Sequence, residues 1–169
     1  MAAALLSLTV FAVTTVGPPT AQGQDRAPGL TGADRPDDVM MARQLLMSGI
    51  EDEMMAIELA TGGKELQLND LKSHAYVIST LLTAFPHLFP PQTKPSISLD
   101  GSPSTTSATL AIWQDFEDFY GKAQAAASVA YDASQAGSAD KFRELAQKLR
   151  GGCDGCHARY MRVGEPPKP

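Results

Sequence analysis

The chain has 169 residues with 14 basic and 19 acidic side chains, which gives a formal net charge of −5. This length suits one domain. The acidic balance argues against binding to nucleic acid or to an anionic membrane, because both require basic patches on the protein. All charged side chains lie beyond residue 23, so removal of the N-terminal segment would leave the net charge unchanged.

Residues 1–23 are predicted to be a secretory signal peptide. An apolar run from Ala2 to Val16 is too short to span a membrane and is followed by the small-residue ending Ala21-Gln22-Gly23. No Lys or Arg precedes the run, which leaves the true start codon open. The alternative is an apolar N-terminal tail that does not act as a signal peptide. Residues 24–36, rich in Gly, Pro and Asp, are predicted to be a flexible lead-in.

Four segments place apolar residues at alternating spacings of three and four, the pattern of helices that pack in a bundle. The predicted helices run from about Pro36 to Ala60, Glu65 to Phe85, Thr106 to Ala136 and Ser138 to Val163. Gly62-Gly63 and Pro86 should end the first two helices, and Ser138 is the predicted N-cap of the last. The predicted fold class is all-α, an antiparallel up-down-up-down four-helix bundle over residues 37–163, with residues 164–169 as a C-terminal tail.

The order of the helices predicts which ends of them meet. The connection over residues 86–105 is long and rich in Pro, Ser and Gly, and should wrap one end of the bundle. Short connections join the other helices in antiparallel pairs, so the C-terminal half of the fourth should lie beside the N-terminal half of the first. The inward-facing positions of the third helix are predicted to be Trp113, Phe116, Tyr120, Ala123, Ala127 and Ala130.

The motif Cys153-Asp154-Gly155-Cys156-His157 is typical of covalent haem attachment. Cys153 and Cys156 can each form a thioether with a haem vinyl group, and His157 can then bind the iron as the proximal ligand. The predicted cofactor is therefore one covalent haem c. Because such attachment takes place outside the bacterial cytoplasm, the motif agrees with a signal peptide and with a periplasmic location in a Gram-negative bacterium. The alternatives are a redox dithiol and half of a zinc site. A redox dithiol would be expected in a βαβ unit, and a zinc site would need a second pair of ligands; the sequence shows neither.

Two residues of the first helix should face a haem carried by the fourth. Arg43 occupies an inward position, where a guanidinium is costly unless it is paired. A haem propionate would be a bidentate partner for it, and a packed position at the bundle rim is the alternative. The thioether of Met47, one turn later, is a possible sixth iron ligand, or Met47 serves core packing alone. Because seven residues span about 10.5 Å along a helix, at most one of Met40, Met47 and Met54 can reach the iron.

With CDGCHARY near its C-terminus, its four-helix pattern and MARQLLM at the start of the first helix, the chain resembles the class II c-type cytochromes, the cytochrome c′ family. The resemblance covers about Pro36 to Arg162, and AFPHLFPP and LAIWQDFEDF are similar to the family's inter-helix loop and third-helix start. It implies that Arg43 lies beside the haem propionates and that Met47 faces the iron on the distal side. Four positions after the ligand His, the family commonly has a basic residue, where this chain has Met161.

The resemblance is strongest to the low-spin branch, whose members use a Met at the Met47 position and carry electrons. The sequence therefore predicts a periplasmic monohaem electron carrier, not an enzyme, with His157 and Met47 as axial ligands. One alternative is a five-coordinate cytochrome c′ that binds NO or CO, and a second, of another class, is a non-haem helical bundle with a redox dithiol. His74 and His87 are rival ligands. The expected partners are soluble or membrane-bound redox proteins and a second copy in a homodimer, but no nucleic acid.

Overall fold

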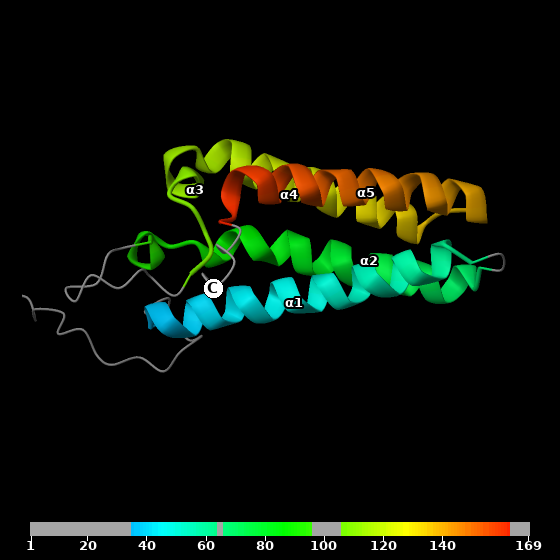
Figure 1. Ribbon diagram of the computed structural model, residues 1–169, viewed down its shortest axis with the longest axis horizontal. Coiled ribbons are helices and arrows are strands. Elements are labelled where there is room, and N and C mark those ends of the chain that lie inside the picture. The colour runs from blue at the N-terminus through cyan, green and yellow to red at the C-terminus, as the bar shows by residue number, and fades with distance from the viewer. Residues whose placement is uncertain (1–34, 64–65, 96–105, 163–169) are drawn as a thin grey trace, which may run out of the picture. The chain divides into compact units, whose positions relative to one another are not determined.

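The protein, seen in a computed structural model, is a bundle of four long helices that alternate in direction (Figure 1). The structure describes residues 35–63, 66–95 and 106–162, which all belong to the compact unit Asp34–Pro169. The predicted signal peptide over residues 1–23, the lead-in over 24–36 except its last two residues, and the tail over 164–169 lie outside the described residues and stay predictions.

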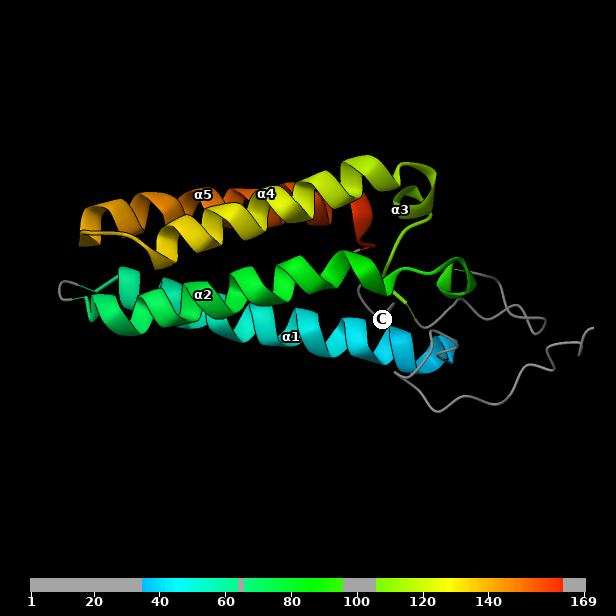
Figure 2. The same cartoon turned by 180° about the vertical axis from the view of Figure 1, so that it is seen from behind.

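The long helices are α1 (Pro36–Thr61), α2 (Leu68–Ala84), α4 (Phe116–Ser134) and α5 (Ala139–Tyr160), with the short helix α3 (Ala111–Gln114) before α4 and the 3₁₀ helices η1 (Phe85–Leu88) and η2 (Pro91–Thr93) after α2. Seen from behind, α2 and α4 lie side by side in front of the other two (Figure 2). The C-terminal half of α5 and the N-terminal half of α1 occupy the same end of the bundle (Figure 1). The predicted all-α fold class and the up-down-up-down order are confirmed.

Local sequence explains where the helices begin and end. Pro36 occupies the first turn of α1 together with two acidic residues, whose charge favours a helix N-terminus, and Gly62 follows its last residue. The hydroxyl of Ser138 accepts a hydrogen bond from the Lys141 amide at 3.2 Å, so Ser138 is the N-cap of α5 as predicted. The second helix is shorter than predicted, since α2 begins at Leu68 and gives way to η1 at Phe85.

The prediction of one continuous helix from Thr106 to Ala136 is wrong. Asp115 leaves the helical conformation, with φ −140° and ψ 65°, and its side chain caps α4 by accepting a hydrogen bond from the Asp118 amide. Residues 106–109 pair with the end of α5 instead, where Ala108 forms an isolated β-bridge with Met161 and the Thr109 amide donates to the Tyr160 carbonyl at 2.9 Å. This tertiary pairing also ends α5 at Tyr160, before the predicted end at Val163.

The break at Asp115 changes which aromatic side chains face the core. Phe116 and Tyr120, predicted to face inward, are 42% and 38% exposed, whereas Phe119 is 2% exposed. Ile112 of α3 is buried beside Phe119. Because α4 is a separate helix that begins at Phe116, the apolar spacing of three and four residues in α3 does not predict which side of α4 faces the core.

Two hydrophobic clusters form the interior. The larger runs along the bundle and includes Ile57, Ile78 and Phe142, while the smaller, at the end of the bundle where α5 stops, consists of Phe89, Ile112, Phe119 and Tyr160. Burial of each such large apolar side chain contributes roughly 1.5–3 kcal/mol. α1 and α5 contact each other much less than the other neighbouring long helices do. Within the described ranges, no helix has the length and apolarity needed to cross a membrane.

Candidate functional site

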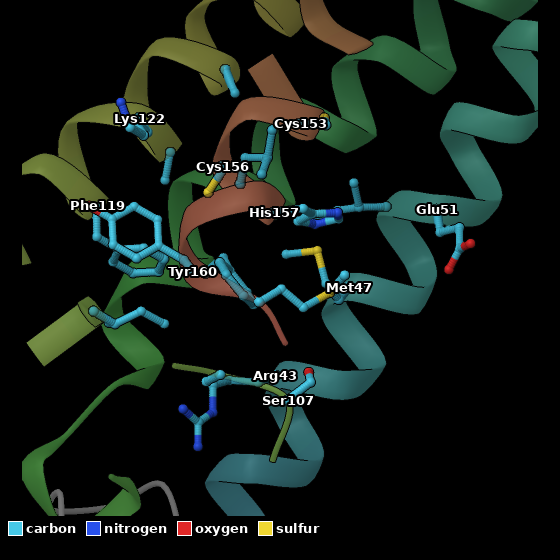
Figure 3. Close-up of a pocket in the computed structure, with 18 of the residues that line it drawn as sticks. Arg43, Met47, Glu51, Ser107, Phe119, Lys122, Cys153, Cys156, His157 and Tyr160 are labelled. Carbon is cyan, nitrogen blue, oxygen red and sulfur yellow. The ribbon is translucent and has the colours of Figure 1, made fainter. Parts of the chain in front are cut away.

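A cavity of about 480 Å³ is lined by residues of α1, α2, α4 and α5, and by residues of the connections at the end of the bundle where α5 stops. The cavity contacts both hydrophobic clusters. Its lining includes all five residues that the sequence predicts for the site, namely Arg43, Met47, Cys153, Cys156 and His157 (Figure 3). Residues from opposite ends of the sequence therefore meet at one place.

Cys153 and Cys156 line the cavity from α5. Their spacing of three puts them on one face of the helix, and both are free, half-buried thiols. Cys153 packs against the larger hydrophobic cluster and Cys156 against the smaller one. Burial raises the pKa of both thiols, which disfavours the thiolate. A redox-active dithiol usually contains a thiol of lowered pKa, so these surroundings do not favour the dithiol alternative.

His157 and Met47 reach the cavity from different helices. His157 lies in the last turn of α5 and Met47 near the middle of α1, and both are half-buried. Figure 3 shows the imidazole of His157 and the thioether of Met47 facing the same space. An imidazole nitrogen and a thioether sulfur are the axial ligands of the Met/His class of haem sites. Met40 and Met54 also line the cavity, one two turns before Met47 and the other two turns after it.

Arg43 lies in the cavity wall and is a buried residue, with 5% of its surface exposed. The guanidinium carbon lies 4.5 Å from the ring centre of Phe89 and 5.9 Å from that of Trp113, within cation–π range. Its Nη2 donates to the Thr93 carbonyl at 3.5 Å, whereas its Nη1 is buried and has no hydrogen-bond partner among the described residues. Burial lowers the pKa of Arg43.

An incompletely paired guanidinium in the wall of a cavity fits an anionic occupant. An Arg presents several donors in a plane and pairs best with a carboxylate or a phosphate. A haem carries two carboxylates, the thiols suit its vinyl groups, and His157 and Met47 suit its iron. The residues present therefore fit a haem.

The two other histidines lie outside the cavity lining. His74 of α2 is bonded through Nδ1 to the Glu53 carboxylate of α1, and His87 is an exposed residue whose ring contacts Tyr120. Within the described part of the chain, no group of three or more His, Cys, Asp or Glu side chains is placed to bind a metal ion. The positions of His74 and His87 therefore do not favour either residue as an iron ligand, and no zinc site is favoured among the described residues.

The position four residues after His157 also has a defined environment. Met161 lines the cavity and forms the bridge with Ala108. The next residue, Arg162, is exposed and donates through its side chain to the Thr106 carbonyl at 2.8 Å. The guanidinium of Arg162 is thus directed to the connection before α3, and Arg162 is not among the residues that line the cavity.

Sequence reasoning missed the aromatic and backbone groups that hold Arg43. Phe89 stacks on the guanidinium, and the indole of Trp113 donates to the Phe89 carbonyl at 3.0 Å. Thr93, in η2, supplies the acceptor for Nη2. The signals in the sequence were the Phe89-Pro90-Pro91 run, which restricts the backbone, and the tryptophan at the start of the third helical segment.

Comparison with known proteins agrees with this geometry. The family described as Cytochrome C' matches residues 38–161. Cytochrome c-556 of Agrobacterium tumefaciens (strain II Chrys) is 31% identical over 121 residues, which are 70% of this chain and 92% of that protein. A helical bundle with a C-x-x-C-H motif on its last helix defines a class of c-type cytochromes. The chain belongs to the cytochrome c′ family, and the resemblance stated from the sequence is confirmed.

Solved structures have the same fold. Cytochrome c′ from Thermochromatium tepidum superposes with a TM-score of 0.65 at 19% identity, over 77% of this chain and 98% of that one. A second cytochrome c′, described as having an unusual ligand-controlled dimer dissociation, gives a TM-score of 0.66 at 19% identity and the same two coverages. These two structures share the four-helix bundle fold with this chain.

Proposed function

We propose that the protein is a monohaem electron carrier whose iron is bound by His157 and Met47. The observation that carries this proposal is the position of both side chains in the wall of one cavity, on two helices that are distant in sequence. The relative described as cytochrome c-556 supports it. When bound, a haem supplies a one-electron couple between ferric and ferrous iron.

The remaining site residues have distinct roles in this proposal. Cys153 and Cys156 hold the group covalently on α5, and Arg43 donates hydrogen bonds to a propionate. The wall around them is largely apolar, with Phe119, Ile112 and Leu82 among the lining residues. Such a wall limits access of water, which, with the identity of the axial ligands, sets the reduction potential.

Absorption spectra of the haem-loaded protein in both oxidation states test the proposal. Binding of Met47 predicts a low-spin ferrous spectrum and slow or weak binding of CO, because CO must displace a bound ligand. A high-spin ferrous spectrum with rapid CO uptake would contradict the electron-carrier function. It would support the five-coordinate alternative, in which Met47 only packs beside an open site for NO or CO.

The proposed setting is the bacterial periplasm, reached through the predicted signal peptide. The single C-x-x-C-H motif supports one haem per chain. The net charge of −5 favours redox proteins with basic surfaces as partners and disfavours nucleic acid. No enzymatic step is proposed, since every predicted site residue is accounted for by holding a haem.

A homodimer is part of the proposal. The relative with ligand-controlled dimer dissociation supports it, as do exposed apolar side chains along the outward side of α1. These side chains are Met41, Leu45, Met55 and Leu59, which are 50–76% exposed. Sedimentation of the haem-loaded protein should show a dimer that Leu45→Glu and Leu59→Glu together dissociate. A monomer at all accessible concentrations would exclude this assembly.

A further inference from the structure

The last turn of α5 carries His157 and is held in part by groups outside the helix, beside the bond from the Met161 amide to the His157 carbonyl at 3.0 Å. The final carbonyl groups of a helix lack partners within it, and terminal turns open most readily. In α5 the Tyr160 carbonyl accepts from the Thr109 amide at 2.9 Å, and the Arg162 amide donates to the Ser107 carbonyl at 2.7 Å. A proposed iron ligand therefore lies in a turn whose order depends on tertiary contacts.

The buried side chain of Tyr160 connects this turn to α4, beside the exposed ion pairs of Arg159 with Asp115 and Asp118. Tyr160 is 3% exposed and follows His157 by three residues, so both belong to the same helical turn. Its hydroxyl donates to Oδ2 of Asp118 on α4 at 2.5 Å, and its ring meets that of Phe119 edge to face at 5.2 Å between centres. Tyr160 thus links the ligand-bearing turn to α4 by one polar and one apolar contact.

Asp118 is well suited to accept this bond. Its carboxylate also pairs with Lys122 at 3.3 Å and with Arg159 at 3.5 Å, and it lies in the first turn of α4, where a negative charge is favourable. The hydrogen bond from Tyr160, with further help from these cations, lowers the pKa of Asp118. Burial and the same bond raise the pKa of Tyr160 to about 12, so the hydroxyl remains a donor at neutral pH.

Asp118 and Lys122 also lie near the haem-attachment side of the cavity. Lys122 lines the cavity together with Cys156 and Tyr160 (Figure 3). Because Lys122 pairs with the Asp118 carboxylate at 3.3 Å, this carboxylate lies directly behind the cavity wall. A change in how well the Asp118 charge is compensated would therefore be felt within the cavity.

We infer that Tyr160 and Asp118 are positioning residues for His157: their hydrogen bond holds the ligand-bearing turn of α5 against α4 and compensates part of the carboxylate charge behind the cavity wall. This inference rests on the proposed haem site. It does not depend on whether Met47 binds the iron, because the bond lies on the α4–α5 side of the cavity.

Tyr160→Phe tests the bond, since it keeps the aromatic ring and removes only the hydroxyl. In the haem-loaded protein, amide hydrogen exchange in the last turn of α5 should become about tenfold faster, the effect of losing a hydrogen bond to a charged group. The reduction potential should fall, because a less compensated carboxylate favours ferric over ferrous iron. Tyr131→Phe is the matched control, as Tyr131 is a half-exposed residue near the opposite end of α4.

A double-mutant cycle separates this bond from general loosening of the fold. Asp118→Ala should also accelerate exchange in the last turn, and Tyr160→Phe should add little to it, because the two substitutions remove the same bond. Additive effects, or exchange and potential in Tyr160→Phe equal to those of Tyr131→Phe, would overturn the inference. A high-spin wild-type spectrum would contradict binding by Met47 but leave the exchange result intact, so the two proposals fail separately.

Discussion

His157 on α5 and Met47 on α1 face one cavity from two helices that have little other contact with each other. Antiparallel packing brings the end of the last helix beside the beginning of the first. A ligand that binds both side chains would fill the space between α1 and α5.

Covalent attachment should depend on Cys153 and Cys156. In cells with a haem-attachment system and export to the periplasm, the wild-type protein should retain haem after denaturing electrophoresis. Replacement of both residues by Ala should abolish haem staining, because no thioether can form. Unchanged staining of the double variant would show that the attachment site is elsewhere. Absence of staining in the wild type would favour a non-haem bundle.

Met47→Ala should open one axial position of the iron. A soft sulfur ligand suits ferrous iron and tends to raise the potential of a His-ligated haem. The variant should therefore show a high-spin ferrous spectrum, a lower potential and CO association at least tenfold faster than in the wild type. Met55→Ala is the matched control, since Met55 is on the same helix and 50% exposed. Equal CO kinetics in the two variants would show that Met47 only packs in the cavity.

Arg43→Leu should lower the reduction potential of the haem-loaded protein and raise the free energy of unfolding of the haem-free chain. With haem, loss of the cation leaves a propionate less compensated, which should lower the potential at neutral pH and change its pH dependence. Without haem, no described residue accepts a hydrogen bond from the buried Nη1, so the substitution should stabilise the chain by about 1–3 kcal/mol in urea unfolding. Arg143→Leu, at an exposed ion pair with Asp140, is the control. An unchanged potential would place Arg43 in a packing role.

The stability of the haem-loaded protein should depend on pH through Tyr160. The pKa of Tyr160 is about 12 in the fold against its ordinary value of 10.0. Between these values the unfolded chain loses a proton that the folded chain keeps, so stability should decrease as pH rises from 10 to about 12. Tyr160→Phe should lose less stability than Tyr131→Phe over this range, as measured by urea midpoints. Parallel curves of urea midpoint against pH for the two variants would contradict a contribution from the Tyr160 hydroxyl.

At low pH, Asp118 should make the stability of the haem-loaded protein decrease as pH falls. Its pKa is lowered below the ordinary 3.8, so its contribution is present above that value and is lost as pH falls through the lower folded value. Because the Tyr160 hydroxyl is the largest cause of this lowering, Tyr160→Phe should also flatten the acid decline. The same urea titration, extended to low pH, measures both effects.

Most of the long helices could be predicted, because the apolar spacing of three and four is a local property of each segment. The interruption at Asp115 could not, since its cap and the pairing of Ala108 with Met161 depend on which segments meet. For the same reason, periodicity assigned Phe116 and Tyr120 to the core where the structure buries Phe119. Arg43 was expected to face inward, but the aromatic rings around it, and an Nη1 that no described residue bonds, became visible only in the fold.

The sequence alone determined the chemistry that the chain can offer, because two thiols and an imidazole in C-x-x-C-H are neighbours in any helical conformation. It also determined the helical class through the periodicity of its apolar residues. Tertiary structure decided what stands opposite that motif. Only the packing of α1 against the rest of the bundle brings Met47 and Arg43 to His157, and only the contact of α5 with α4 joins Tyr160 to Asp118. Such pairs depend on the direction and rotation of helices distant in sequence, which no local pattern specifies.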